Sequence, residues 1–517
     1  MWQKIQNSAA LFSITVRNVA KNPKFRTVIP NNIHTFAKSS IMFIGREKEL
    51  AELRNTLNAE SSKFVAVYGR RRVGKTMLIK EAFGKKISFH YAGVYNVTKR
   101  KQLLNFSLAL KNAGMADFQV PEDWFSAFNL LESYLDSIKT EKKVVFIDEV
   151  PWMDTPKSDF LPALEHFWNN WATLRNDIIL IICGSATSWI VKKVFKNKGG
   201  LHNRLSFKIN LRPFTLKECE EYSKAAGLVM TRFQILEAYM ILGGVPYYWS
   251  FLNKGVSLAK NIDNMFFAED ARLNGEFSEL YAALFKNPDP YVAVVEQLAG
   301  KSYGMSRDDL LEKLSLSDGG KLSTILEDLV NCGFIRKYNK IGSKTKNALY
   351  QLIDCYTIFY YKFLKGNSGN DPAFWELSQG TSAYNNWAGI SFERVCLLHI
   401  NQIKSGLSIL GVITNVCSWR SSDISKDDKR DIKGAQIDLL LDRNDKIINL
   451  CEMKFSSNEY QITKAYDENL RNKKARFIEE TNTRKAVHIT MVTTYGVKHN
   501  EYFNNIQSQV TLDELFA

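Results

Sequence analysis

Short continuous runs of apolar residues recur in the first half of the chain, separated by polar stretches and by stretches with helical spacing. Phe64–Tyr68, Val144–Ile147 and the run IILIICG that begins at residue 178 have the length of strands and are shorter than typical helices. Apolar runs without polar alternation are typical of strands that are covered on both faces. The pattern predicts an α/β fold built on a buried parallel sheet.

Residues 289–352 change to helical spacing and then to strand patterns. Three short helices are predicted, in YVAVVEQLAG, RDDLLEKL and GGKLSTILEDLVNCGFI. The third has apolar residues at i, i+3, i+4 and i+7, namely Leu322, Ile325, Leu326 and Leu329. FIRKYNK and ALYQLID then predict a hairpin. Three helices followed by a hairpin form the pattern of a winged helix.

Two interpretations of this winged helix stay open. It could bind DNA through phosphate contacts from the hairpin-loop lysines Lys340, Lys344 and Lys346. Against this, Glu327 and Asp328 are expected on the polar face of the third helix, where acidic side chains repel a phosphate backbone. The segment would then not contact DNA; in the family that the motifs given below resemble, such a winged helix is often an internal regulatory lid.

After a linker in GNSGNDPAF (residues 366–374), the predicted order is helix, strand, strand, helix, strand. The two adjacent strands lie in IDLLLDRNDKIINLCEMKF (residues 437–455). A hairpin centred on Asp445 pairs residues whose numbers add up to 890. Asp438 then faces Glu452, with about 4.5–5.5 Å between their Cβ atoms. Lys454 lies on the same face as Glu452, two positions further along the strand.

Two carboxylates that face each other destabilise a sheet unless a cation lies between them. A Mg²⁺ ion between Asp438 and Glu452 could bind a water and a scissile phosphate, while Lys454 stabilises charge in the transition state. The alternative is a slipped register, in which the acids separate and become solvated, as expected for Asp442 and Asp445. Lys454 alone could also neutralise Glu452.

The loop after the first apolar run carries the clearest motif in the chain. GRRRVGKT fits G-x-x-x-x-G-K-[ST], a phosphate-binding loop between a strand and a helix. The glycines let backbone N–H groups surround phosphate oxygens, Lys75 reaches the β- and γ-phosphates, and Thr76 offers its hydroxyl to Mg²⁺. ATP and Mg²⁺ are therefore the expected ligands. The expected nucleotide-binding residues are Gly69, Arg70, Arg71, Arg72, Val73, Gly74, Lys75, Thr76 and Met77.

An acidic pair ends the second apolar run, in VVFIDE. Asp148 is expected to hold the magnesium ion, and Glu149 to orient or deprotonate the attacking water. Ser185, after the third run, could contact the γ-phosphate through its hydroxyl or could simply end a strand. Arg204 could contact the nucleotide of its own chain or of a neighbouring copy, which leaves a homo-oligomer open. It could equally be a solvated arginine.

Charge and cysteine content narrow the class of protein. The formal net charge of +15 is compatible with nucleic-acid binding, but it also describes many enzymes. No apolar run approaches 18 residues, so neither a membrane span nor a membrane partner is expected. Seven cysteines without C-x-x-C spacing indicate a reduced, cytoplasmic protein with no zinc site. Residues 1–41 carry six basic residues and no acid, and are expected to be a basic N-terminal extension.

Several motifs in a fixed order connect the chain to a known family. They are FIGREKELAEL, GRRRVGKT, FIDEVPWMD, GSATSW, LRPF and GGVPYYW. With them, residues 43 to about 250 closely resemble the archaeal-type ATPases of the AAA+/STAND lineage. The resemblance implies a P-loop NTPase core with a helical lid and a winged helix. It also implies that Gly244-Val245-Pro246 lies close to the nucleotide, whereas the local sequence alone predicts a helix end there.

The C-terminal segment resembles the PD-(D/E)XK nuclease fold, and the ATPase family commonly ends in such a domain. Asp438 and Glu452-Met453-Lys454 match its signature, Glu393 matches the metal-binding acid of its first helix, and Gln461 matches a polar residue on the following helix. The expected domains are a basic extension (1–41), a P-loop ATPase core (42–225), a helical lid (226–288), a winged helix (289–365) and a restriction-endonuclease-like α/β domain (373–517).

Two functions of different classes follow. The first is an ATPase that acts as a nucleotide-dependent switch for a Mg²⁺-dependent nuclease, with DNA rather than RNA as the expected nucleic acid. The second is a signalling or scaffold ATPase whose C-terminal domain is catalytically inactive and only binds nucleic acid or a protein partner.

Overall fold

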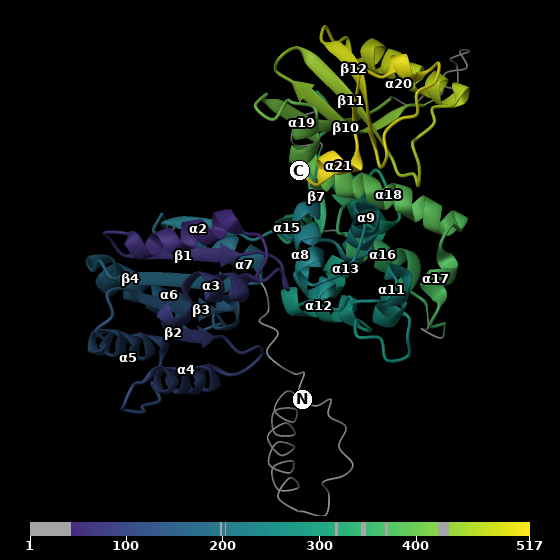
Figure 1. Ribbon diagram of the computed structural model, residues 1–517. Helices are drawn as coiled ribbons and strands as arrows, with labels where there is room; N and C mark the ends of the chain where they lie inside the picture. Colours follow the sequence, from purple (N-terminus) through teal and green to yellow (C-terminus); the bar gives the residue numbers. More distant parts are fainter. Residues whose placement is uncertain are drawn as a thin grey trace, which may run out of the picture. The chain divides into compact units, whose positions relative to one another are not determined.

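The computed structural model describes residues 43–196, 199–201, 203–315, 319–342, 348–367, 371–421 and 434–517. The extension predicted for residues 1–41 lies outside the described residues, as do Lys344 and Lys346. Residues 44–517 form one compact unit (Figure 1). No helix in the described ranges combines the length and apolar composition that a membrane crossing requires.

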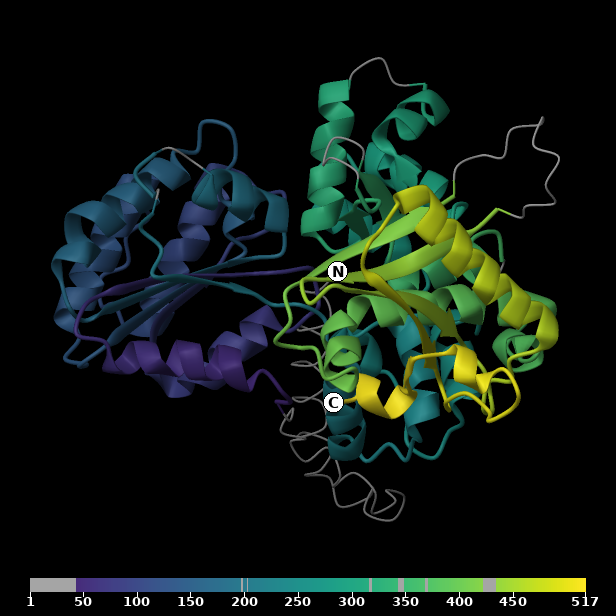
Figure 2. The ribbon, with the colours of Figure 1, turned by 90° about the horizontal axis from the view of Figure 1, so that it is seen from above.

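A parallel five-stranded sheet forms the centre of the N-terminal part, as the apolar runs predict. Its strand order is β2-β3-β4-β1-β5, and Figure 2 shows helices on both sides of it. The three central strands are buried almost throughout because both of their faces are covered. The strands are β1 (Lys63–Tyr68), β2 (Ile87–Ala92), β3 (Lys143–Asp148), β4 (Ile178–Gly184) and β5 (Phe207–Asn210). The helices are α2 (Glu47–Asn55), α3 (Lys75–Phe83), α4 (Lys99–Ala113), α5 (Trp124–Ser137), α6 (Phe160–His166) and α7 (Thr187–Ile190).

A group of helices follows the sheet. The first two of them begin at capping boxes, Thr215 with Glu218 and Thr231 with Gln234, which satisfy backbone N–H groups at the helix starts. The second is apolar almost all round and is buried among its neighbours. The helices are α8 (Leu216–Ala225), α9 (Arg232–Leu242), α10 (Pro246–Trp249), α11 (Leu258–Phe266) and α12 (Glu276–Leu284).

The three helices and the hairpin predicted for residues 289–352 are present. They are α13 (Asp289–Ala299), α14 (Arg307–Lys313), α15 (Gly319–Asn331), β7 (Ile335–Tyr338) and β8 (Leu349–Leu352). A two-residue strand, β6 (Met305–Ser306), completes a small sheet in the order β6-β8-β7. The chain then continues as α16 (Cys355–Phe359) and the π-helix η10 (Tyr360–Leu364).

The polar face of α15 differs from the expectation. Asp328 is buried, and its carboxylate accepts hydrogen bonds from Lys192 and from the Tyr291 hydroxyl, the latter at 2.9 Å. Glu327 forms an ion pair with Lys196. The prediction that both acids lie on a free polar face was therefore wrong for Asp328. The helix packs against α7, and its acids meet the lysines that follow that helix.

A second five-stranded sheet forms the C-terminal part, in the order β13-β12-β11-β10-β9. The predicted succession of helix, strand, strand, helix and strand is present as α18, β10, β11, α20 and β12, and the outer strands β9 and β13 were not predicted. The strands are β9 (Thr414–Arg420), β10 (Gln436–Arg443), β11 (Ile447–Lys454), β12 (Ala486–Thr493) and β13 (Ser508–Val510). The helices are α17 (Phe374–Ser378), α18 (Ser382–Leu398), α19 (Ile400–Gly406), α20 (Lys464–Thr481) and α21 (Leu512–Leu515).

One hydrophobic core joins the helical region, the small sheet and the C-terminal part. It extends along the sequence from Phe214 to Phe516, whereas the parallel sheet has a core of its own between Phe64 and Leu201. Side chains of α9, α16 and α18 contribute to the shared core, and α18 packs against both of the other helices. The segments predicted as lid, winged helix and C-terminal domain are thus packed into one body.

His399 connects α18 to the start of α8 inside this shared core. Its Nε2 accepts a hydrogen bond from the Leu216 N–H at 3.0 Å, so the proton resides on Nδ1, which donates to the Val395 carbonyl at 2.8 Å. Burial lowers the pKa of His399 to about 4. The histidine is therefore neutral in the folded protein.

This depressed pKa predicts a loss of stability in acid. Below the ordinary histidine pKa of about 6.5, the histidine is protonated in the unfolded chain but stays neutral in the folded chain. The free energy of unfolding therefore falls as the pH falls from 6.5 towards 4. The contribution of His399 to this loss between pH 7 and pH 4.5 is about 2 kcal/mol. Urea unfolding of the wild type and of His399→Gln at both pH values measures it. An equal pH dependence in the two proteins would contradict the assignment.

Candidate functional site

The phosphate-binding loop lies between β1 and α3, where the motif predicts it. Gly74, with φ 95°, is the N-cap of α3, so the loop leads directly into the positive end of that helix. A Cβ atom on Gly69 would lie 2.2 Å from the Leu211 carbonyl oxygen, which explains the need for glycine there. The Lys75 Nζ is buried and donates to the Gly69 and Arg70 carbonyls at 2.9 and 3.0 Å.

The predicted magnesium-binding side chains lie together. The Thr76 hydroxyl donates to the Asp148 carboxylate at 2.6 Å, and Asp148 ends β3. The two sequence motifs are 72 residues apart and meet because their parallel strands end at the same edge of the sheet. A hydroxyl and a carboxylate are the hard oxygen donors that Mg²⁺ prefers, so this pair fits the metal.

Glu149 and Ser185 also lie together. The Ser185 hydroxyl donates to Glu149 Oε2 at 2.9 Å, and the Ser185 N–H donates to the same oxygen at 3.2 Å. Burial raises the pKa of Glu149, with a further contribution from Asp148, while Lys75 lowers it. Glu149 also has a left-handed backbone, with φ 49°. Ser185 is therefore in direct contact with the predicted catalytic carboxylate.

Two arginines of the loop bind acids of other elements. Arg70 forms an ion pair with Asp354, and each side chain is only 4% exposed. Asp354 is the N-cap of α16, where it accepts a hydrogen bond from the Thr357 N–H at 3.0 Å. Burial alone lowers the pKa of Arg70, but the adjacent Asp354 outweighs it and the pKa is raised.

The second of these arginines binds the helical region. Arg72 forms an ion pair with Glu276, the first residue of α12, and its guanidinium carbon lies 4.1 Å from the ring centre of Tyr247. Glu276 also accepts a hydrogen bond from the Tyr248 hydroxyl at 2.7 Å. The loop motif placed both arginines at the nucleotide, but it could not show which acids their side chains bind.

The glycine–proline element packs against the LRPF motif. The Phe214 N–H donates to the Gly244 carbonyl at 2.6 Å. A Cβ atom on Gly244 would lie 1.9 Å from the Phe214 carbonyl oxygen, so only glycine fits. Arg46, from the first of the motifs, donates to the Arg212 carbonyl at 2.6 Å and lies over the Phe214 ring. The motifs therefore build the junction between the parallel sheet and the helices that follow it.

Arg204 is exposed, and its side chain has no hydrogen-bond or ion-pair partner within the described part of the chain. Arg71 is half-buried. Their roles at a nucleotide stay predictions.

The C-terminal hairpin has the predicted register. Leu439 pairs with Cys451 and Leu440 with Leu450, so the residue numbers of each pair add up to 890. These pairs exclude the slipped register for the paired part of the hairpin. They end at Leu439 and Cys451, and a bulge lies in β10 between Ile437 and Leu440, so the direct pairing of Asp438 with Glu452 stays a prediction.

Glu393 of α18 faces the same carboxylates. Burial raises its pKa to about 7, with a further contribution from Asp438 and a smaller one from Glu452, while Arg394 and Lys454 act in the opposite direction. Four of the predicted residues, Glu393, Asp438, Glu452 and Lys454, are thus close enough to influence one another electrostatically. Arg336 of β7 adds a half-buried positive charge next to Asp438, whose backbone carbonyl it approaches to 3.5 Å.

Helix α20 supplies partners that the sequence did not reveal. The Tyr466 hydroxyl donates to Glu452 Oε2 at 2.9 Å, and Lys473 forms an ion pair with Glu452 Oε1 at 2.6 Å. Gln461 is exposed and precedes the helix instead of lying on it. Within the described ranges, no three or more His, Cys, Asp or Glu side chains are grouped closely enough to hold a metal ion. A metal here would need oxygen ligands from the backbone or from a bound phosphate beside Asp438 and Glu452.

Comparison with known proteins identifies the N-terminal part. Residues 43–251 match the family described as an ATPase domain predominantly from Archaea. The uncharacterized protein MJECL04 of Methanocaldococcus jannaschii is 24% identical over 80% of this chain and 88% of its own length. The uncharacterized ATP-binding protein MJ0423 of the same organism is 46% identical over 9% of this chain and 78% of its own.

Solved structures match this chain at lower sequence identity. The Walker-type ATPase PABY2304 of Pyrococcus abyssi has 15% identity and a TM-score of 0.43, over 61% of this chain and 95% of that one. The ORC2 protein of Aeropyrum pernix has 14% identity and a TM-score of 0.37, over 64% and 94%. At these values the likeness says nothing about function. The family match and the assembled phosphate-binding loop lead to one conclusion: residues 43–251 are an ATPase domain of the type found predominantly in Archaea.

Proposed function

We propose that the chain is an ATP-hydrolysing switch whose nucleotide state controls a Mg²⁺-dependent nuclease site in its C-terminal part, with DNA as the nucleic acid. The observation that carries the switch is the pair of loop arginines. Arg70 and Arg72 are bound to Asp354 and Glu276, so a phosphate-induced movement of the loop pulls directly on α16 and α12.

The side chains around the loop support hydrolysis. Lys75 would exchange its two carbonyl partners for the β- and γ-phosphates, and Thr76 with Asp148 would hold Mg²⁺, which neutralises phosphate charge when bound. Glu149 would accept a proton from the attacking water, since its raised pKa makes it a better base than an exposed glutamate. Ser185 would hold the Glu149 carboxylate in position.

The facing carboxylates support a nuclease site. Burial of Glu393 near Asp438 and Glu452 concentrates negative charge that a divalent cation would neutralise. Lys454 and Arg336 supply positive charge beside it for a phosphate. When bound, Mg²⁺ would activate a water and polarise the phosphate, while Lys454 would stabilise the charge that develops on it.

One observation favours a second function, in which the C-terminal part only binds a partner. Glu452 is already occupied by Tyr466 and Lys473, which neutralise it without a metal. A winged-helix role in DNA binding is less favoured, because Ile341 donates its N–H to Ser418 of β9 at 2.9 Å and so ties the start of the hairpin loop to the C-terminal sheet.

Removal of single side chains at the loop should separate binding from hydrolysis. Lys75→Ala should weaken ATP binding by about 100-fold, because it removes charge-assisted hydrogen bonds to the phosphates. Glu149→Gln should bind ATP normally but hydrolyse it at least about 100-fold more slowly. Titration with a fluorescent ATP analogue and a phosphate-release assay measure the two effects. Normal hydrolysis by Glu149→Gln would contradict the role of Glu149.

The nuclease site has its own test. Asp438→Ala and Lys454→Ala should each abolish Mg²⁺-dependent cleavage of DNA, whereas Asp445→Ala, in the exposed turn of the same hairpin, should cleave like the wild type. Gel analysis of labelled DNA with and without Mg²⁺ measures cleavage. DNA binding that survives in both site variants, with no cleavage by the wild type, would favour the second function.

Coupling between the two sites can be tested at Glu276. Glu276→Gln keeps the shape of the side chain but removes the charge that binds Arg72, so ATP hydrolysis should persist while DNA cleavage loses its dependence on ATP. Glu279→Gln is the matched control, because Glu279 lies on the same helix, is 69% exposed and is 3.8 Å from Arg72. The quantity to compare is the ratio of the DNA cleavage rate with ATP to the rate without ATP. A ratio in Glu276→Gln or in Lys75→Ala that equals the wild-type ratio would contradict the coupling.

A further inference from the structure

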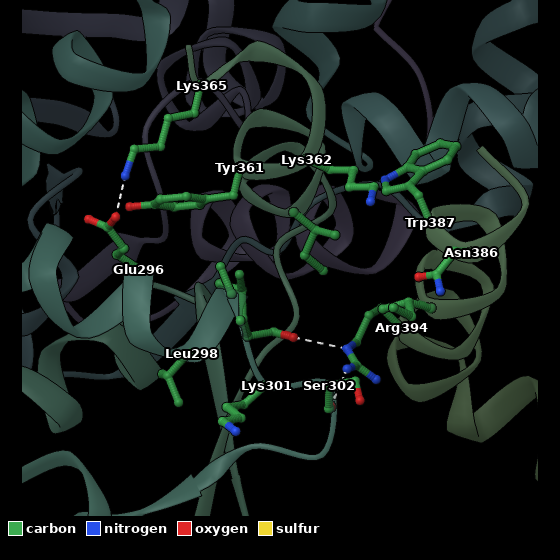
Figure 3. Close-up of a pocket in the computed structure, with 15 residues that line it drawn as sticks. Glu296, Leu298, Lys301, Ser302, Tyr361, Lys362, Lys365, Asn386, Trp387 and Arg394 are labelled. Carbon is green, nitrogen blue, oxygen red and sulfur yellow. Dashed lines mark hydrogen bonds and ion pairs between the residues drawn. The ribbon is translucent and has the colours of Figure 1, made fainter. Parts of the chain in front are cut away.

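A cavity of about 510 Å³ lies among α13, η10 and α18, outside both sites described above (Figure 3). Its size falls within the usual range for small-ligand pockets. Residues from the loop after α13, from η10 and from α18 line it, and Figure 3 shows Lys362 and the indole of Trp387 extending toward one another from different elements.

The cavity contains buried donors without acceptors. Trp387 is 2% exposed, and its Nε1–H has no hydrogen-bond partner within the described residues. Arg394 is equally buried; its Nε and Nη2 donate to the Leu352 and Ser302 carbonyls, and its Nη1, which has no hydrogen bond within the described residues, forms an ion pair with Glu393. An unpaired buried donor is costly, so its presence beside a cavity points to an acceptor that enters the cavity.

The lining charges agree with an anionic acceptor. Lys301, Lys362, Lys365 and Arg394 contribute four positive charges, and Glu296, paired with Lys365, contributes one negative charge. The side chains of Lys301 and Lys362 have no hydrogen-bond or ion-pair partner in the described ranges. Indole and ammonium groups only donate, so they need an acceptor, and a neutral water would accept from them without supplying a counter-charge for the two lysines.

Arg394 also connects this cavity to the carboxylate site. It follows Glu393 directly in α18, and its Nη1 lies 3.6 Å from Glu393 Oε2. A nucleic-acid strand carries one negative phosphate per nucleotide, so a strand at the carboxylates presents further phosphates to the neighbouring surface. A phosphate is therefore the anion that this position would meet.

We propose that this cavity binds a phosphate ester, held by Trp387 Nε1, Lys362 and Arg394, and that the phosphate belongs to a nucleic-acid strand whose next phosphates reach the carboxylate site. Naming a nucleic acid rests on the proposed function, whereas the phosphate site rests on the cavity alone. A free mononucleotide carries the same phosphate chemistry, and the experiment distinguishes the two sources.

The test measures binding of three probes to the full-length chain, in the Asp438→Asn background so that cleavage does not interfere. The probes are a single-stranded DNA oligonucleotide with a 5′-phosphate, the same oligonucleotide without it, and AMP. Fluorescence anisotropy measures binding of the two oligonucleotides, and competition against them measures binding of AMP. Trp387→Phe and Lys362→Gln should each weaken binding of the phosphorylated oligonucleotide by about tenfold. Lys362→Gln should also reduce the slope of log Kd against log salt by about 0.7, as expected for one lost phosphate contact on a single strand.

Two matched controls separate binding from folding. Trp375→Phe changes a tryptophan that packs against Trp387 but does not line the cavity, and Lys313→Gln removes an exposed lysine of α14. Neither should change Kd or the salt slope. Lys362 is exposed, so its variant keeps the test decisive even if Trp387→Phe unfolds.

The outcomes are distinct. Equal binding of the DNA probes and of AMP by wild type, Trp387→Phe and Lys362→Gln would overturn the phosphate site. Loss of AMP binding alone in the two variants would support the phosphate site and assign it to a mononucleotide instead of a strand. If the wild type fails to cleave DNA but its oligonucleotide binding depends on Trp387 and Lys362, the phosphate site stands and the proposed nuclease activity falls.

Discussion

A buried ion pair between Arg70 and Asp354 joins the phosphate-binding loop to helix α16. A charge that is removed from water is tolerated only when it is paired and hydrogen-bonded. Removal of either residue would therefore leave the other as an unpaired buried charge, which is strongly destabilising. Arg70 lies in the phosphate-binding loop, and Asp354 caps the helix that enters the core shared by the helical region and the C-terminal part. This interaction therefore links the phosphate-binding loop directly to the C-terminal core.

The second arginine gives this connection two points of attachment. Arg72 binds Glu276 at the start of α12, next to the tyrosines that follow the glycine–proline element. A movement of the loop on nucleotide binding would therefore be passed to both acids. A hydrophobic pair in place of Arg70 and Asp354 would hold the parts together as well, but it would not respond to phosphate charge. The ion pairs therefore explain how a nucleotide could act at a distance.

Periodicity and motif spacing predicted much of the fold. Continuous apolar runs located β1, β3 and β4, and the centre of symmetry at Asp445 located the hairpin register, because side-chain alternation leaves few ways to bury one face. The contact between Thr76 and Asp148 followed from the rule that parallel strands end at one edge. Glu393 was placed by family resemblance; it lies near Asp438, and its role as a metal ligand stays a prediction.

What the sequence could not provide was the direction of long side chains. The loop motif fixes the backbone around a phosphate, yet Arg70 and Arg72 bind acids more than 200 residues away, and nothing local marks those acids. Asp328 looked exposed because its lysine partners come from another segment. Tyr466 and Lys473 were missed because their contact with Glu452 depends on where α20 crosses the sheet.

Hydrogen–deuterium exchange with and without Mg²⁺ and ATP measures whether the loop moves the helices that its arginines bind. Nucleotide should change the exchange rates in α12 and α16 as well as at the loop, and a change confined to residues 69–77 and 148–149 would contradict the switch.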